Sequence, residues 1–175
     1  MAKLRKMLGS ADSPYIVALM RLIETQSKVT IANWSVAYAK ENWLPIFEKL
    51  NPSDKRLSHA LQAAQDYLDG KIKLAEAKNV LKEAQVVAKE VEKNPVAYAA
   101  ARAVSVAAST ITTPTSALGM AFYGAAAVAY DAIGLVESAE VYDQLALEEC
   151  MKMHRSLSEV AIEDEAYPAK INWNC

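Results

Sequence analysis

The stretch AVSVAASTITTPTSALGMAFYGAAAVAY, residues 103–130, covers 28 positions without one formally charged side chain. Nine of these positions are alanine and seven are serine or threonine. A run of this kind is found either in membrane-spanning segments or in helices buried at the centre of a helical protein. Thr113-Pro114-Thr115 divides the run, because proline cannot continue a helix. The stretch is therefore predicted to form a helical hairpin with two Ala-rich arms.

The composition of the hairpin argues against insertion into a membrane. Alanine is close to neutral on insertion scales, serine and threonine are unfavourable, and a spanning helix needs about 20 strongly apolar residues. Neither arm is expected to be long enough to span. Small side chains instead let neighbouring helix backbones approach closely. We therefore expect no membrane association and a hairpin buried on most sides by other helices.

The segments around the hairpin show the spacing of amphipathic helices. Ser13-Pro14 and Asn94-Pro95 each combine a capping residue with proline at the first helical position. A helix that ends at Asn51-Pro52 is expected to bend at Pro45, and Ser53 is expected to cap the helix that follows. The clearest periodicity, over residues 73–93, consists of Leu74, Ala77, Leu81, Ala84, Ala88 and Val91.

The last long helix is predicted in the segment that begins at residue 135. One face of it is expected to carry Ala139, Tyr142, Ala146, Met153, Leu157 and Val160. No strand pattern and no repeat at a fixed period accompany these helices. The sequence predicts an all-α fold, a single domain of residues 1–175 formed as a bundle of about seven helices around the central Ala-rich hairpin. Residues 1–12 and 167–175 are expected to be irregular tails.

Length and composition exclude several classes of protein. The 175-residue chain is long enough to bury a core without staples, and its apolar fraction of 53% is typical of globular proteins. The net charge is −2, so no positive field attracts nucleic acid. No apolar segment of a secretory signal precedes Gly9, and two cysteines in all suit a reducing compartment. A cytoplasmic location is expected.

The small net charge hides a strong asymmetry. Residues 1–102 contain sixteen Lys and Arg against eleven Asp and Glu, whereas residues 103–175 contain three against ten. The two halves could pair with each other within a compact fold. Alternatively, the acidic half could offer a surface to a basic partner.

Standard catalytic motifs are absent. Gly119 and Gly124 have the spacing of a phosphate-binding loop, but Ala125 and Ala126 stand where that loop needs a lysine and a hydroxyl. The G-x-S-x-G, H-E-x-x-H and C-x-x-C patterns of hydrolases, zinc proteases and redox proteins do not occur. The chain is therefore expected not to be an enzyme.

One pair of residues could still carry chemistry. Cys150 and His154 stand four positions apart and hence on one helix face, where a thiol could lie near an imidazole or both could bind a metal. A closed zinc site would have to add His59, the other histidine, and Cys175 in the tail. The simpler interpretation is a half-buried thiol beside a surface histidine, with no metal and no cofactor.

Two segments, residues 32–78 and 98–127, carry a resemblance to a known family. The matching positions in the first are Trp34, Ala37, the LPIFE of Leu44 to Glu48, Pro52, Asp54, Arg56, Ala60, Ala64, Gly70 and Ile72. Those in the second are Ala101, Arg102, Thr110, Leu118 and Gly119. At these positions the chain resembles the putative immunity proteins of bacteria, small all-helical proteins whose expected role is to neutralise a toxin made by the same or a neighbouring cell.

The chain departs from this family at one point. The Ala-rich segment of the family carries several histidines, whereas Val106, Thr112 and Ser116 stand at those positions here. No metal or polar role of those histidines is therefore carried over to this chain.

The resemblance implies a protein that binds and neutralises a protein toxin by occlusion. If the toxin is basic, the acidic half is expected to supply the contact face. The candidate partner-binding residues are Glu148, Glu149, Glu159 and Glu163.

Two alternatives remain. The chain could be an enzyme or a small-molecule binder with a polar pocket between the Ala-rich helices, lined by Ser105, Ser109, Thr112, Thr115 and Ser116. It could also be a homo-oligomeric scaffold in which the Ala-rich faces of different copies meet.

Overall fold

The structure, a computed structural model, describes residues 3–174 and contains only helices within them. The elements are α1 (Pro14–Glu24), α2 (Lys28–Asn42), α3 (Leu44–Leu50), α4 (Arg56–Leu68), α5 (Leu74–Gln85), α6 (Val87–Glu90), α7 (Pro95–Ser109), α8 (Ser116–Ile133) and α9 (Ala139–Val160). Seven of them have eleven residues or more. The predicted all-α single domain is confirmed.

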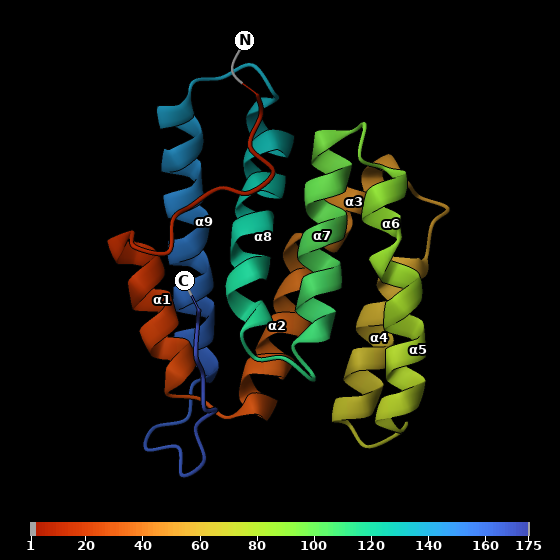
Figure 1. Ribbon diagram of the computed structural model, residues 1–175, viewed down its shortest axis with the longest axis vertical. Coiled ribbons are helices and arrows are strands. Elements are labelled where there is room, and N and C mark those ends of the chain that lie inside the picture. The colour runs from red at the N-terminus through yellow and green to blue at the C-terminus, as the bar shows by residue number, and fades with distance from the viewer. Residues whose placement is uncertain (1–2, 175) are drawn as a thin grey trace.

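The Ala-rich hairpin lies at the centre of the fold, as the sequence predicts. Its arms are α7 and α8, which run side by side in Figure 1. Helices α9 and α1 pack on the α8 side, and α4, α5 and α6 pack on the α7 side. Helix α2 passes behind the hairpin and contacts α7, α8 and α9. The hairpin therefore joins the two flanks of the bundle.

Two helix starts agree with the sequence. Ser13 precedes Pro14 at the start of α1, although its side chain makes no capping hydrogen bond. Asn94 caps α7, because its Oδ1 accepts hydrogen bonds from the amides of Val96 and Ala97, both at 3.1 Å. The short Asn94 side chain thus satisfies donors that the first helical turn leaves free.

Three expectations about helix boundaries were wrong. Pro45 does not bend a helix but stands in the first turn of α3, where its missing amide hydrogen costs nothing, while α2 ends at Asn42. The long pattern from residue 73 to 93 divides at Val86, and the short α6 turns its buried residues toward α7. Helix α4 begins after Lys55 instead of Ser53, because Asp54 Oδ1 accepts a hydrogen bond from the amide of Arg56.

The expectation that neither hairpin arm could span a membrane also needs correction. Helix α8 has 18 residues and is long and apolar enough to cross one by length and composition alone. In the fold, however, 56% of its residues are buried against other helices, and a buried core helix meets the same criterion.

Both terminal segments pack onto the helices. In the N-terminal segment, the amide of Leu8 donates to the carbonyl of Phe122 in α8 at 3.1 Å. In the C-terminal segment, the amide of Ala169 donates to the carbonyl of Gln26 at 2.8 Å, and Trp173 Nε1 donates to Glu24 Oε1 at 2.6 Å. Ile171 and Trp173 are partly buried against the core.

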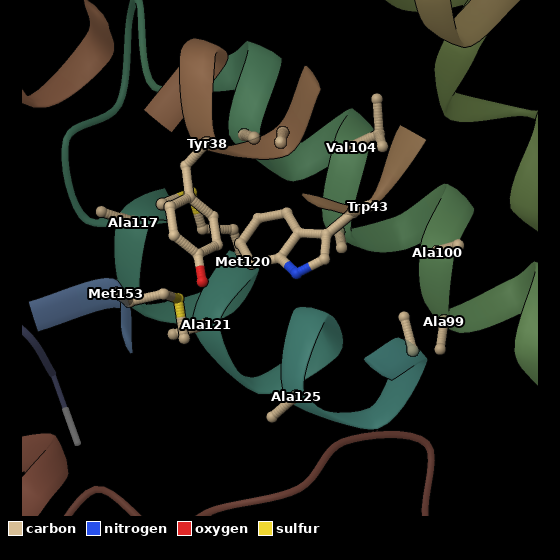
Figure 2. Close-up of a cluster of buried hydrophobic side chains, with 14 of the residues drawn as sticks. Tyr38, Trp43, Ala99, Ala100, Val104, Ala117, Met120, Ala121, Ala125 and Met153 are labelled. Atoms are coloured by element: carbon tan, nitrogen blue, oxygen red, sulfur yellow. The ribbon is translucent and has the colours of Figure 1, made fainter. Parts of the chain in front are cut away.

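The closest packing in the core joins Trp43 to α8. Trp43 lies between α2 and α3 and is fully buried. A Cβ atom added at Gly124 would lie 2.2 Å from both Cε2 and Cζ2 of the Trp43 ring. Figure 2 shows this ring beside Tyr38, with Ala121 and Ala125 of α8 below it. The absence of a side chain at Gly124 is thus what admits the ring.

We expect Gly124→Ala to lower the free energy of unfolding by about 1–3 kcal/mol, because the added methyl group collides with Trp43. Gly119→Ala is the matched control on the same helix, since its Cβ would meet Val106 Cγ1 at an ordinary 3.4 Å. That change should be neutral or stabilise by up to about 1 kcal/mol through helix propensity. Chemical denaturation monitored by circular dichroism measures both; equal effects would contradict the close packing at Trp43.

Candidate functional site: a groove between helices α2 and α9

A groove of about 700 Å³ lies between α2 and α9. Three side-chain hydrogen bonds cross between the two helices: Trp34 Nε1 to Ser156 Oγ at 2.6 Å, the Tyr38 hydroxyl to Glu149 Oε1 at 2.7 Å, and Lys152 Nζ to Asn42 Oδ1. From the Trp34–Ser156 bond to the Lys152–Asn42 bond, later residues of α2 meet earlier residues of α9, so the two helices are antiparallel.

Aromatic residues form the floor of the groove. Trp34 and Tyr38 both line it, yet each is only 4% exposed, so only a small part of each side chain faces the groove. Their hydrogen bonds to α9 hold the rings in place. Ala37 is exposed and lies between Trp34 and Tyr38 in the sequence of α2. Its small side chain leaves the middle of the groove open. The floor is rigid and largely apolar.

A buried carboxyl group lies under one end of this floor. Glu149 is 5% exposed, and its Oε1 accepts hydrogen bonds from the Tyr38 hydroxyl and from Trp43 Nε1, the latter at 3.3 Å. No cation lies within ion-pair distance of it among residues 3–174. Burial raises the pKa of Glu149, while the hydrogen bond from Tyr38 and the nearby charge of Lys152 oppose the shift.

Glu149 therefore cannot belong to a partner-binding face. Its role is internal, because it satisfies the polar atoms of Tyr38 and Trp43 inside the core. The helical spacing of α9 already indicates that position 149 is buried. The apolar face of α9 has a gap between Ala146 and Met153, and position 149 falls in that gap at helical spacing.

The other three acidic candidates are exposed but do not form one cluster. Glu148 accepts a hydrogen bond from Gln144 at 3.0 Å, Glu159 lines the groove, and Glu163 follows the end of α9. Glu148 and Glu159 share one side of the helix, about 16 Å apart along its axis. These three residues remain candidates for partner binding.

The acidic half of the chain is only slightly compensated by the basic half. Two ion pairs join the halves: Arg5 with Asp143 at 2.8 Å, and Lys49 with Asp131. None of the other eight carboxylates of residues 103–174 has an ion-pair partner within the described chain. Six of those eight are exposed: Glu137, Glu140, Glu148, Glu159, Glu163 and Asp164. The folded chain thus keeps an uncompensated acidic surface along α9 and its two ends, interrupted by the exposed Lys152 and Arg155 of α9.

The hydroxyl groups proposed for a pocket in the hairpin are used locally. Ser109 Oγ donates to the carbonyl of Val106 at 2.7 Å and lies 3.0 Å from Ser116 Oγ, and Thr112 Oγ1 donates to the carbonyl of Ser109 at 3.2 Å. Such bonds back to helix carbonyls are ordinary for serine and threonine. Neither Ser105 nor Thr115 lines the groove. No observation in residues 3–174 brings the five together around a cavity.

Cys150 and His154 show no reactive arrangement. The Cys150 thiol is buried and donates to the carbonyl of Tyr15 at 3.5 Å. Burial raises its pKa to about 12, so the thiol stays protonated at neutral pH. Within residues 3–174, no three His, Cys, Asp or Glu side chains are placed to hold a metal ion. Cys175 lies outside the described residues.

Asp54 and Arg56, two residues of the family resemblance, form a structural network. Arg56 forms a bidentate pair of hydrogen bonds with Asp54. Its Nε donates to Oδ1 at 3.0 Å, and its Nη2 donates to Oδ2 at 2.7 Å. Its guanidinium also donates to Glu90 in α6, at 2.5 and 3.2 Å. This guanidinium lowers the pKa of the Asp54 carboxyl through its hydrogen bonds. The network ties the start of α4 to α6.

Replacement of Glu149 tests the buried carboxyl group. Its pKa is raised on folding, so ionisation of Glu149 destabilises the folded chain. Relative to Glu149→Gln, the wild type should lose stability as the pH rises from about 4, the unfolded-state value, through the folded-state pKa. Thermal unfolding of both proteins from about pH 4 to 7 measures this difference. A difference that does not change with pH would contradict the burial of an ionisable group here.

Glu149→Leu provides the comparison for hydrogen bonding. Leucine keeps the volume but leaves the Tyr38 hydroxyl and Trp43 Nε1 without their acceptor. We expect this change to lower the free energy of unfolding by about 1–3 kcal/mol.

Comparison with known proteins places the chain in a family. Residues 21–156 match the model of a family described as Imm-5 like putative immunity protein. No curated protein and no solved structure matches the chain. The matched region includes all of α2 and most of α9, the two walls of the groove, and it confirms the resemblance found in the sequence. The chain belongs to the Imm-5 like putative immunity protein family.

Proposed function

We propose that this chain is a cytoplasmic protein that binds a protein toxin and neutralises it by covering the toxin's active site or substrate channel. Membership of the immunity family supports a protein partner. The uncompensated acidic surface along α9 is the single observation that supports a basic partner. Toxins that act on nucleic acid carry such a basic face, because their own substrate is a polyanion.

The acidic surface would act mainly on the rate of association. Exposed charges that are not paired within the chain attract an oppositely charged partner over about a Debye length, about 8–10 Å at physiological salt. Once the complex forms, packing around the groove would determine how long it lasts. Occlusion asks for a rigid complementary surface and needs no catalytic residue, which fits the internal roles of Glu149 and Cys150.

The first experiment identifies the partner and its inhibition. The purified chain captures proteins from the producing bacterium, mass spectrometry identifies them, and each captured toxin domain is assayed with and without the chain. We expect one toxin domain whose activity falls in proportion to the chain added. If no captured protein loses activity, neutralisation is the wrong function.

A charge-reversal experiment then tests the acidic surface. Glu148→Lys with Glu163→Lys should slow association with the inhibited toxin by about tenfold or more at low salt, with the difference shrinking as salt rises. The matched control is Glu83→Lys with Glu92→Lys, which makes the same net change at exposed positions away from α9. Stopped-flow binding across a salt series measures both. Equal on-rates for the two double variants would contradict the electrostatic part of the proposal while leaving neutralisation intact.

A further inference from the structure

Four charged side chains line the groove: Glu41 from α2, and Lys152, Arg155 and Glu159 from α9. All four are exposed, and none forms an ion pair within residues 3–174. The unpaired cations are unusual because the acidic half around them holds ten carboxylates. Lys152 instead hydrogen-bonds Asn42 and lies 5.9 Å from the centre of the Tyr38 ring. Both cations are thus available to a group from outside the chain.

The order of these charges along the groove follows from the antiparallel helices. Glu41 and Lys152 lie at the end marked by the hydrogen bond from Lys152 to Asn42. Arg155 stands one turn further along α9, beside the bond between Trp34 and Ser156. Glu159 lies another turn on. The groove therefore presents a carboxylate, two cations and a carboxylate in sequence.

The end beyond Glu159 is apolar. Val29 of α2 and Val160 of α9 both line the groove there and are 59% and 53% exposed. Ile162 follows directly and is 52% exposed. Branched aliphatic residues with half of their surface in water are typical of interaction sites when they adjoin a cavity.

We propose that the groove receives a single helix of the protein partner. Acidic side chains at the middle of that helix face Lys152 and Arg155, basic side chains on either side face Glu41 and Glu159, and an apolar side chain packs on Val29 and Val160. This inference rests on the proposed function for the identity of the partner, but the charge order is a property of this chain alone.

A helix fits the groove better than an extended peptide. The walls are themselves helices, whose backbone groups are already hydrogen-bonded, so no free edge is present for an added strand. The charges of α9 recur once per helical turn, at positions 152, 155 and 159, which matches the spacing of side chains on one face of another helix. Exposed Ala37 in the middle of the groove leaves room for the backbone of a third helix to approach.

The groove would set specificity, whereas the acidic surface sets the rate of encounter. A helix shifted by one turn would place a basic side chain against one of the two cations and an acidic side chain against one of the two carboxylates, and such like-charge contacts are costly at an interface. A basic partner without acidic residues at the matching positions would still be attracted to α9 but would not fit. The two cations thus distinguish one basic protein from another.

The test uses two synthetic helical peptides of the same composition, each of about 18 residues, which is longer than the groove. One carries Lys, Glu, Glu and Lys one turn apart, followed by leucine at the Val29 end; the other carries Glu, Lys, Lys and Glu at those positions. Fluorescence anisotropy of labelled peptides at low salt measures affinity for the full chain. We expect the first peptide to bind about tenfold more tightly or better. Equal affinities, or no binding of either peptide at millimolar concentration, would overturn the inference.

Two variants locate the binding site. Lys152→Glu with Arg155→Glu makes all four charges of the groove acidic and should abolish the preference between the peptides, whereas Lys78→Glu with Lys82→Glu on α5, an equal change of charge on the opposite flank, should preserve it. Ala37→Trp should fill the groove and abolish binding of the first peptide, and Ala132→Trp at the exposed end of α8 should not. Unfolding curves identical to the wild type show that each variant folds. Binding that survives Ala37→Trp would place the peptide elsewhere and refute the groove.

The peptide assay contains no toxin, so its outcome is separate from that of the proposed function. If the chain distinguishes the two peptides but neutralises no toxin, the groove binds helices and the proposed immunity role is wrong. If the chain neutralises a toxin but its groove binds neither peptide, the immunity role stands and the helix-binding inference is wrong.

Discussion

The packing of Trp43 against α8 is the contact on which the rest of the structure depends. Gly124 leaves a gap in the surface of α8, and the Trp43 ring fills that gap where any side chain would collide with it. The same ring donates a hydrogen bond to Glu149 in α9. Because Trp43 stands directly after α2, these two contacts hold α2 against both α8 and α9. The groove exists because α2 and α9 are held at this separation.

Helix α9 performs two tasks with its two sides. Its inner side buries Tyr142, Cys150 and Met153 in the core, together with a carboxyl group that satisfies two aromatic donors. Its outer side carries exposed acidic residues that find no partner in the chain. Keeping a carboxyl group in the core costs desolvation, and the hydrogen bonds from Tyr38 and Trp43 offset part of that cost. The same hydrogen bonds make the floor beneath the groove rigid. A surface that binds by occlusion requires such rigidity.

Much of the fold could be predicted from local chemistry. The break at Thr113-Pro114-Thr115, the cap at Asn94 and the proline at the start of α1 all act within a few residues, so their effects can be read directly. The failures had a common cause. Whether Pro45 bends a helix or begins one, and whether the pattern around Val86 continues, depends on how buried residues such as Trp43 and Val87 reach the hairpin. Glu149 was misplaced because its charge was given more weight than its position in the helical repeat.

The sequence by itself determined the helical class, the central hairpin, the charge asymmetry and the family, because each depends on composition, local spacing or matching positions. Only the tertiary structure decided which charges stay unpaired and where a partner could dock. The groove joins residues far apart in the chain: Trp34 bonds to Ser156, and Tyr38 to Glu149. Contacts between distant segments depend on how the helices cross, and helix crossing is set by the packing of side chains against one another, which helical periodicity alone does not encode.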